Sequence, residues 1–221
     1  MKNNLLFFQE NHPITTKLCF FKMEFNKILA MFEKRQKDLI NIWGGKYYCN
    51  LLDSNLNLKN KIELLNPLSS LPNQYLISET QSDWCLYIEN GLYGTDVFSQ
   101  PSYLAEEWKV EYLALYLDCN LDKGQYGALM FHWGDGAVKE SEYQIKSRTV
   151  LLHKETEQLN FLHEGTPFPF EKLESYKKRT KKERLTIEMI ADYCNYFGVR
   201  LFDLDFYIGE SALINANNQK T

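Results

Sequence analysis

Residues 77–122, with the sequence ISETQSDWCLYIENGLYGTDVFSQPSYLAEEWKVEYLALYLDCNLD, carry the strongest pattern in the chain. They hold nine carboxylates against a single cation, Lys109, although the net charge of the whole chain is only −4. The carboxylates are Glu79, Asp83, Glu89, Asp96, Glu106, Glu107, Glu111, Asp118 and Asp122. Eight aromatic side chains are interleaved with them: Trp84, Tyr87, Tyr93, Phe98, Tyr103, Trp108, Tyr112 and Tyr116. Because charged side chains seldom enter a core unpaired, the stretch predicts an acidic, aromatic-rich surface.

Secondary structure within this stretch follows from its hydrophobic pattern. Residues 74–78 and 84–89 are apolar runs next to turn residues, and they predict two strands. Ser102 is a suitable N-cap, and the apolar side chains after it recur at helical spacing, which predicts a helix over residues 102–117. Glu107 and Glu111 then lie four residues apart on one exposed ridge of that helix.

The chain before this stretch predicts one clear helix. Apolar residues recur at three-and-four spacing, and Gly44-Gly45 ends the pattern. The apolar positions are Phe25, Ile28, Leu29, Phe32, Leu39 and Trp43. Residues 46–49 predict a short strand. Residues 1–22 show no comparable pattern and predict a loosely held N-terminal arm.

The chain after it alternates between strand and helix patterns. Residues 126–133 and 143–145 flank Gly134-Asp135-Gly136 and predict a hairpin with its turn at these three residues. Residues 150–162 fit either a strand or a helix. Residues 171–178 are helical in composition, and Thr180 with Glu183 fits a capping box for a further helix that ends at Gly198. Residues 199–208 alternate as a half-buried strand does, and the tail from Glu210 is expected to fray.

These elements predict an α+β protein with a single domain over residues 23–209. We expect a mostly antiparallel sheet with flanking amphipathic helices, an arm at 1–22 and a frayed tail at 210–221. No run of eighteen apolar residues occurs, and residues 1–22 lack the apolar core of a secretory signal. The sequence therefore predicts a cytoplasmic protein, and its Asn- and Lys-rich composition is typical of an AT-rich bacterial or phage genome.

The five cysteines are scattered, and no two are in C-x-x-C spacing. They predict small buried side chains in a reducing compartment, with neither a disulfide framework nor a zinc site. A catalytic thiol remains the less favoured alternative.

Three clusters resemble functional sites but fit better as structure. Residues 118–124 place oxygen ligands at alternate positions, as a calcium loop does, yet Lys123 stands where an EF-hand needs glycine. His132 and Asp135 lie three residues apart at the predicted turn, where the glycines have a conformational role. The basic cluster at residues 177–184 fits a solvated corner between helices better than a nucleic-acid contact. We therefore expect no metal, no cofactor, no membrane contact and no nucleic-acid partner.

No signature of an α/β-hydrolase, P-loop, dinucleotide-binding or zinc-protease site occurs in the sequence. We interpret the acidic stretch as a surface for a basic protein partner, since aromatic side chains anchor interfaces and carboxylates steer cationic surfaces. The concrete form is a non-catalytic immunity protein that neutralises a bacterial toxin, for example by covering a nuclease active site. The predicted contact residues are Glu79, Asp83, Trp84, Tyr87, Glu89, Tyr103, Glu106, Glu107, Trp108, Glu111 and Asp118.

Three alternatives stay open at this stage. One is a hydrolase of sugars or phosphates with paired carboxylates from this stretch. Its candidate acids are Glu106, Glu107, Glu111, Asp118 and Asp122. The second is that the acidity serves solubility alone. The third is a nucleic-acid binder that uses the basic cluster at residues 177–184.

Overall fold

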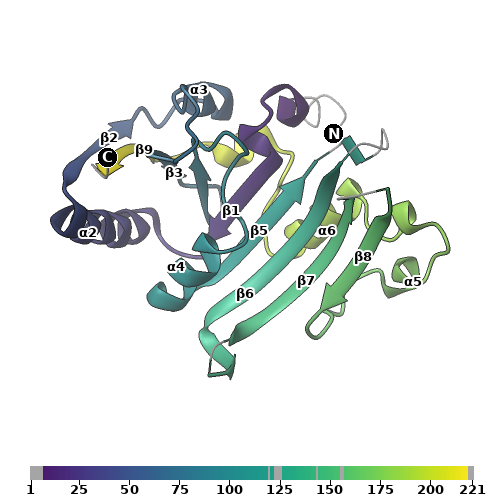
Figure 1. The fold of residues 1–221 in the computed structure, drawn as a ribbon. Helices are drawn as coiled ribbons and strands as arrows, with labels where there is room; N and C mark the ends of the chain where they lie inside the picture. Colours follow the sequence, from purple (N-terminus) through teal and green to yellow (C-terminus); the bar gives the residue numbers. More distant parts are fainter. Residues whose placement is uncertain (1–6, 119, 122–125, 143, 155–156, 219–221) are drawn as a thin grey trace.

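The computed structural model describes residues 7–118, 120–121, 126–142, 144–154 and 157–218. Within these ranges, nine strands form one antiparallel sheet in the order β2-β9-β3-β4-β1-β5-β6-β7-β8, with helices on both faces (Figure 1). The predicted α+β class is confirmed. No helix in the described ranges is long and apolar enough to cross a membrane.

The strands are β1 (Lys17–Phe21), β2 (Gly45–Leu52), β3 (Gln74–Ser78), β4 (Cys85–Glu89), β5 (Glu111–Leu117), β6 (Gly127–Ser141), β7 (Gln144–Lys154), β8 (Leu159–Glu164) and β9 (Ser211–Asn218). The α-helices are α2 (Phe25–Trp43), α3 (Leu58–Glu63), α4 (Gln100–Trp108), α5 (Leu173–Tyr176) and α6 (Ile187–Tyr196). Three 3₁₀ turns are η1 (Ile14–Thr16), η3 (Lys181–Glu183) and η4 (Leu204–Tyr207). The predicted helix from Phe25 to Trp43 is confirmed, as are strands β3 and β4.

The two ends of the chain are more ordered than the sequence predicts. β1 lies at the middle of the sheet, where Cys19 pairs with Tyr87 of β4 and with Ala114 of β5. β9 lies between β2 and β3, with Ala212, Ile214 and Ala216 buried. The expected arm is therefore wrong for 17–21, and the expected frayed tail is wrong for 211–218. Residues 1–6 and 219–221 lie outside the described ranges.

The predicted helix over 102–117 is two elements. α4 ends at Trp108, because Lys109 adopts a left-handed conformation with φ 58°. β5 then begins at Glu111 and is buried on both faces, so its apolar side chains form a continuous run that does not distinguish strand from helix. Glu107 and Glu111 consequently do not share a helical ridge.

The predicted turn at 134–136 lies inside β6. Here glycine serves close packing instead of a turn, because a Cβ at Gly134 would overlap the Tyr112 ring and one at Gly136 would overlap the Ala105 carbonyl of α4. The hairpin reverses beyond Ser141, and Gln144 begins β7. The undecided 150–162 segment is extended where it is described, as the end of β7 and the start of β8.

The last third differs from prediction in two places. α6 begins after Thr186, whose hydroxyl accepts a hydrogen bond from the Met189 N–H at 3.3 Å, so the helix start predicted near Thr180 is wrong. The predicted strand at 199–208 is a turn followed by η4, and the Asp203 carboxylate caps it by accepting from the Asp205 N–H. Gly198 follows α6 in the left-handed region, as predicted.

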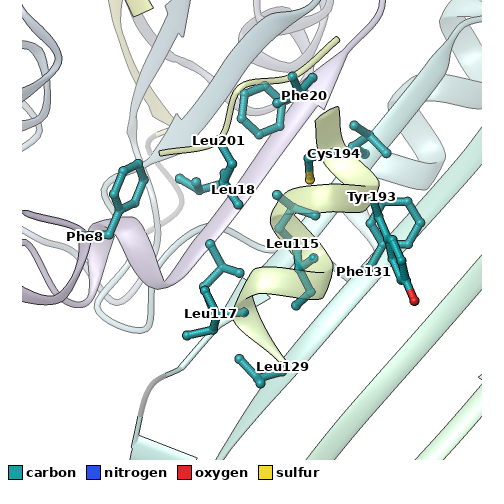
Figure 2. Packing of buried hydrophobic residues seen from close by; sticks show 14 of the residues in the cluster. Phe8, Leu18, Phe20, Leu115, Leu117, Leu129, Phe131, Tyr193, Cys194 and Leu201 are labelled. Carbon is teal, nitrogen blue, oxygen red and sulfur yellow. The ribbon is translucent and has the colours of Figure 1, made fainter. Parts of the chain in front are cut away.

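Each face of the sheet carries its own core. One core packs α3 and α6 against the sheet, and Figure 2 shows Tyr193 and Cys194 of α6 beside Leu115 and Phe131. The other packs α2 and α4 against the opposite face around Phe21. Buried cysteines contribute to both cores, as predicted for Cys19, Cys85 and Cys194. Cys49 is exposed on the edge strand β2, contrary to the prediction, and Cys119 is outside the described ranges.

Candidate functional site: an acidic hollow

The residues predicted to contact a partner fall into a buried group and an exposed group. Trp84, Tyr87, Glu89, Trp108 and Asp118 are all buried, with exposed fractions between 0% and 7%. The prediction that these five lie on a binding surface is therefore wrong. Glu79, Asp83, Tyr103, Glu106, Glu107 and Glu111 remain partly or fully exposed.

The buried group has structural partners. Trp84 donates from its indole N–H to the Phe197 carbonyl at 2.8 Å. Glu89 accepts from the Tyr87 hydroxyl at 2.7 Å and from the Asp96 N–H at 3.1 Å, and burial raises the pKa of its carboxyl. These side chains are polar groups satisfied inside the fold, which a charge count along the sequence does not distinguish from surface acids.

On α4 the acids are neutralised by cations that are distant in sequence. Glu106 pairs with Lys139 of β6, and Glu107 accepts from Arg35 of α2 at 2.8 Å. The Arg35 guanidinium also lies 4.6 Å from the centre of the Tyr103 ring. The α4 surface is therefore a set of ion pairs, and its acids do not form an open negative field.

Two of the remaining exposed acids, Glu79 and Asp83, line a hollow of about 530 Å³. Three segments line it: residues 22–26, which lead from β1 into the first turn of α2, the β3–β4 loop with the first residue of β4, and the residue before β9. Four carboxylates line it, with one cation, Lys22. The carboxylates are Glu24, Glu79, Asp83 and Glu210, and we call this site the acidic hollow.

Glu24 points outward because buried and exposed residues alternate in this segment. Met23 and Phe25 are buried in the core below, so Lys22 and Glu24 point outward. Lys22 Nζ lies 2.9 Å from Glu111 Oε1 and 3.9 Å from Asp83 Oδ2. The hydrogen bond to Glu111 raises the pKa of Lys22. The cation is thus held at one side of the hollow by Glu111, which does not line it.

Backbone hydrogen bonds fix the opposite rim. The Glu79 N–H donates to the Glu210 carbonyl at 2.8 Å, and the Glu210 N–H donates back to Glu79 Oε2 at 3.2 Å. Gln81 is bonded to the same segment through Phe206 and Ile208. The β3–β4 loop and the segment before β9, which carry Glu79 and Glu210, are therefore held together by hydrogen bonds.

A buried lysine supports this rim from below. Lys61 of α3 is fully buried, and its ammonium donates to Ser78 Oγ and to the carbonyls of Tyr207 and Gly209. Burial lowers its pKa to about 8, against the opposing effect of the nearby Glu79. Its three donors are all used within the fold, so Lys61 acts as a structural tie.

The other clusters considered from the sequence do not gather into a site. His132 bonds to Tyr112 and Thr149, whereas the Asp135 carboxylate caps the Ala137 N–H, so the two do not act as a pair. In the 118–124 segment Cys119 and residues 122–124 lie outside the described ranges. Over the rest of the described chain no group of three or more His, Cys, Asp or Glu side chains is arranged to hold a metal ion.

The basic corner is largely engaged with its own neighbours. Lys177 pairs with Glu174 at 2.9 Å, and Lys178 pairs with Glu183 at 3.3 Å. Arg184 donates to the Lys178 carbonyl at 2.7 Å. This pattern agrees with the interpretation of a solvated corner.

Comparison with protein-family models, curated proteins and solved structures finds no match to this chain. The site is therefore interpreted from its own chemistry.

Two of the four carboxylates of the acidic hollow were not predicted from the sequence. Glu24 and Glu210 lie outside 77–122, one before the stretch and one far after it. The only sequence signal for Glu24 is the alternation with Met23 and Phe25. Nothing local marks Glu210, because its position depends on the insertion of β9 next to β3.

Proposed function

We propose that this chain is a non-catalytic binding protein that covers a basic protein partner, with the acidic hollow as the receptor for a cationic side chain. The observation that carries this proposal is the hollow itself, in which four carboxylates face one cation. The carboxylates repel one another, and a Lys or Arg side chain that enters the hollow relieves this repulsion. The cation is also attracted by each of the carboxylates.

The braced rim supports binding over a purely solubilising role. Solubility needs dispersed charge on mobile side chains. Here the backbone of the β3–β4 loop is bonded to the segment before β9, and Glu79 Oε2 accepts from the Glu210 N–H, so the Glu79 carboxylate is held in place before a partner arrives. Preorganised charge loses less entropy on association and gives specificity.

The concrete form remains an immunity protein that neutralises a bacterial toxin such as a nuclease. A nuclease active site is cationic because it holds phosphates. Carboxylates of the acidic hollow can form ion pairs with the same cationic side chains. The same charge disfavours nucleic acid as the partner, because the phosphates would be repelled.

The hydrolase alternative receives less support from the acids that the sequence suggests for it. Paired-carboxylate catalysis needs two acids facing one space. Glu106, Glu107 and Glu111 instead bond to Lys139, Arg35 and Lys22 respectively. Asp118 is buried, and Asp122 lies outside the described ranges.

The test is a pull-down from the source lysate with the tagged chain, washed at low salt and then at about 0.5 M salt, where screening removes most surface attraction. The test variant carries Glu24→Gln, Asp83→Asn and Glu210→Gln. The matched control carries three exposed changes elsewhere: Glu106→Gln, Glu107→Gln and Glu174→Gln.

We expect a basic protein that is retained at equimolar amounts by the native chain and by the control, and lost from the test variant. With the purified partner, titration calorimetry should then give at least a tenfold rise in Kd for the test variant, about 1.4 kcal/mol. A partner that binds both variants equally, or an eluate with no stoichiometric protein, contradicts the proposal.

A further inference from the structure

A second hollow, of about 370 Å³, shares no lining residue with the acidic hollow. It is formed where α4 and the loop before it meet β5, β6 and β7. α4 packs on this face of the sheet against Gly136 of β6, and α6 lies behind the sheet in Figure 1. We call this second hollow the sheet hollow. Its volume falls within the range of small-molecule sites, about 300 to 1,000 Å³.

A chain of hydrogen bonds crosses the floor of the sheet hollow. His132 Nε2 lies 2.6 Å from the Tyr112 hydroxyl, and His132 Nδ1 lies 2.7 Å from the Thr149 hydroxyl. Ser102 of α4 also lines the hollow, and its hydroxyl donates to the Ser99 carbonyl at 2.9 Å. Three side chains on three neighbouring strands, Tyr112, His132 and Thr149, are thus linked in a row.

Burial lowers the pKa of His132 to about 4, so its ring is neutral at pH 7. A neutral imidazole has one donor and one acceptor nitrogen, so His132 donates to one of the two hydroxyls and accepts from the other.

Around this neutral floor the lining is polar on one part and aromatic on another. The polar side chains include Ser102, Gln144, Ser147 and Glu106, and the rim carries Phe98, with 60% of its surface exposed. Glu106 is the one charged side chain of the lining, and Lys139 already neutralises it. A charged ligand therefore finds no unmatched opposite charge here.

We propose that the sheet hollow binds a neutral, hydroxyl-rich ring, that is, a saccharide unit, with its C–H face on Phe98 and its hydroxyls toward Gln144, Ser147 and Glu106. A saccharide presents an apolar face and a polar edge, which matches an aromatic rim beside hydroxyl, amide and carboxylate groups. Gln144 supplies both a donor and an acceptor, and the Glu106 oxygens accept from adjacent hydroxyls. This site is independent of the acidic hollow and of its protein partner.

The test is saturation-transfer NMR with four probes at about 10 mM, so that even millimolar affinity is detected. The probes are the methyl glycosides of glucose, galactose, mannose and N-acetylglucosamine, with the nucleosides uridine and inosine as planar, neutral competitors. The variants are Phe98→Ala and Gln144→Ala. Tyr93→Ala is the matched control, because Tyr93 is an exposed aromatic residue (81%) that does not line the sheet hollow.

We expect transfer to the ring C–H protons of at least one glycoside, at native strength in Tyr93→Ala and with affinity about tenfold weaker in Phe98→Ala and Gln144→Ala. The triple variant of the acidic hollow should bind that glycoside as the native chain does, so failure of one proposal is distinguishable from failure of the other. No transfer to any glycoside, equal transfer in all variants, or transfer to the nucleosides alone overturns the saccharide proposal.

Discussion

Arg148 and Glu171 form a two-point ion pair inside the protein, with Nε to Oε1 at 2.8 Å and Nη2 to Oε2 at 2.6 Å, and both side chains are almost fully buried. Glu171 also accepts from the Tyr176 hydroxyl and from the Phe168 N–H, both at 2.8 Å. Although burial alone would raise it, the pKa of Glu171 is lowered by these hydrogen bonds, first among them that from Arg148. The pair ties β7 to the segment that leads into α5.

Glu171→Gln should strongly destabilise the fold, because it leaves the Arg148 charge buried without a counter-ion. Removing one member of a buried pair costs about 3 to 5 kcal/mol. The free energy of unfolding in urea at neutral pH measures this. Glu174→Gln is the matched control, since its pair with Lys177 is exposed, and it should cost less than about 1 kcal/mol. Equal losses in the two variants would contradict the structural role of the buried pair.

Acid should reveal the neutral state of His132. Its folded pKa is lowered to about 4, so between the ordinary value near 6.5 and that pKa the unfolded chain binds a proton that the folded chain does not. Native stability should therefore fall as the pH drops through this window, by about 1.4 kcal/mol per pH unit from this group.

His132→Gln should remove that contribution. The stability gap between the native chain and the variant, measured by urea unfolding, is expected to be largest at pH 7 and to narrow towards pH 4.5. A gap that stays constant over this range would mean that His132 is protonated as readily in the folded chain as in the unfolded one.

Gly136→Ala should destabilise the contact between β6 and α4. An added Cβ would overlap the backbone at Ala105 and Glu106, which cannot move aside as a flexible side chain does. We expect a loss of about 1 to 3 kcal/mol in thermal or urea unfolding. Ala137→Ser, at the exposed neighbouring position, is the control and should leave the stability unchanged within about 0.5 kcal/mol. A neutral Gly136→Ala would show that α4 does not pack this closely.

Alkylation should distinguish the cysteines by their positions. Cys49 is exposed on β2, whereas Cys19, Cys85 and Cys194 are buried; burial raises the pKa of all four thiols, and most at the three buried ones. Because the thiolate is the reactive form, iodoacetamide should modify Cys49 well before these three. Peptide mass spectrometry over a time course measures the order. Modification of Cys19 or Cys194 at the rate of Cys49 would place them nearer to solvent than this fold does.

Elements with a single dominant period were predictable from the sequence. α2 has one apolar stripe and a glycine stop, and its predicted bounds match the observed ones. β5 was mistaken for helix because a strand buried on both faces has no alternation. Gly134 and Gly136 suggest a turn, and only the approach of Tyr112 and α4 reveals the packing reason for them.

The candidate site was less predictable than the fold. A count of charges indicated acidity but did not separate Glu89, buried and hydrogen-bonded, from Asp83, which is exposed. The acidic hollow depends on residues distant in sequence, so no local window contains it. The hydrogen bonds that link Tyr112, His132 and Thr149 have the same origin, since these residues become neighbours only across paired strands.

The place of β9 has a consequence for how the protein is made. β2 pairs only with β9 in the sheet, although more than 150 residues of chain separate their positions in the sequence, so the first edge strand remains without its neighbour until nearly all of the chain exists. Pairing between segments this far apart is slow to form. During synthesis the edge of β3 that later pairs with β9 is consequently open to other chains. We therefore expect this protein to fold slowly or to need a chaperone that shields this edge.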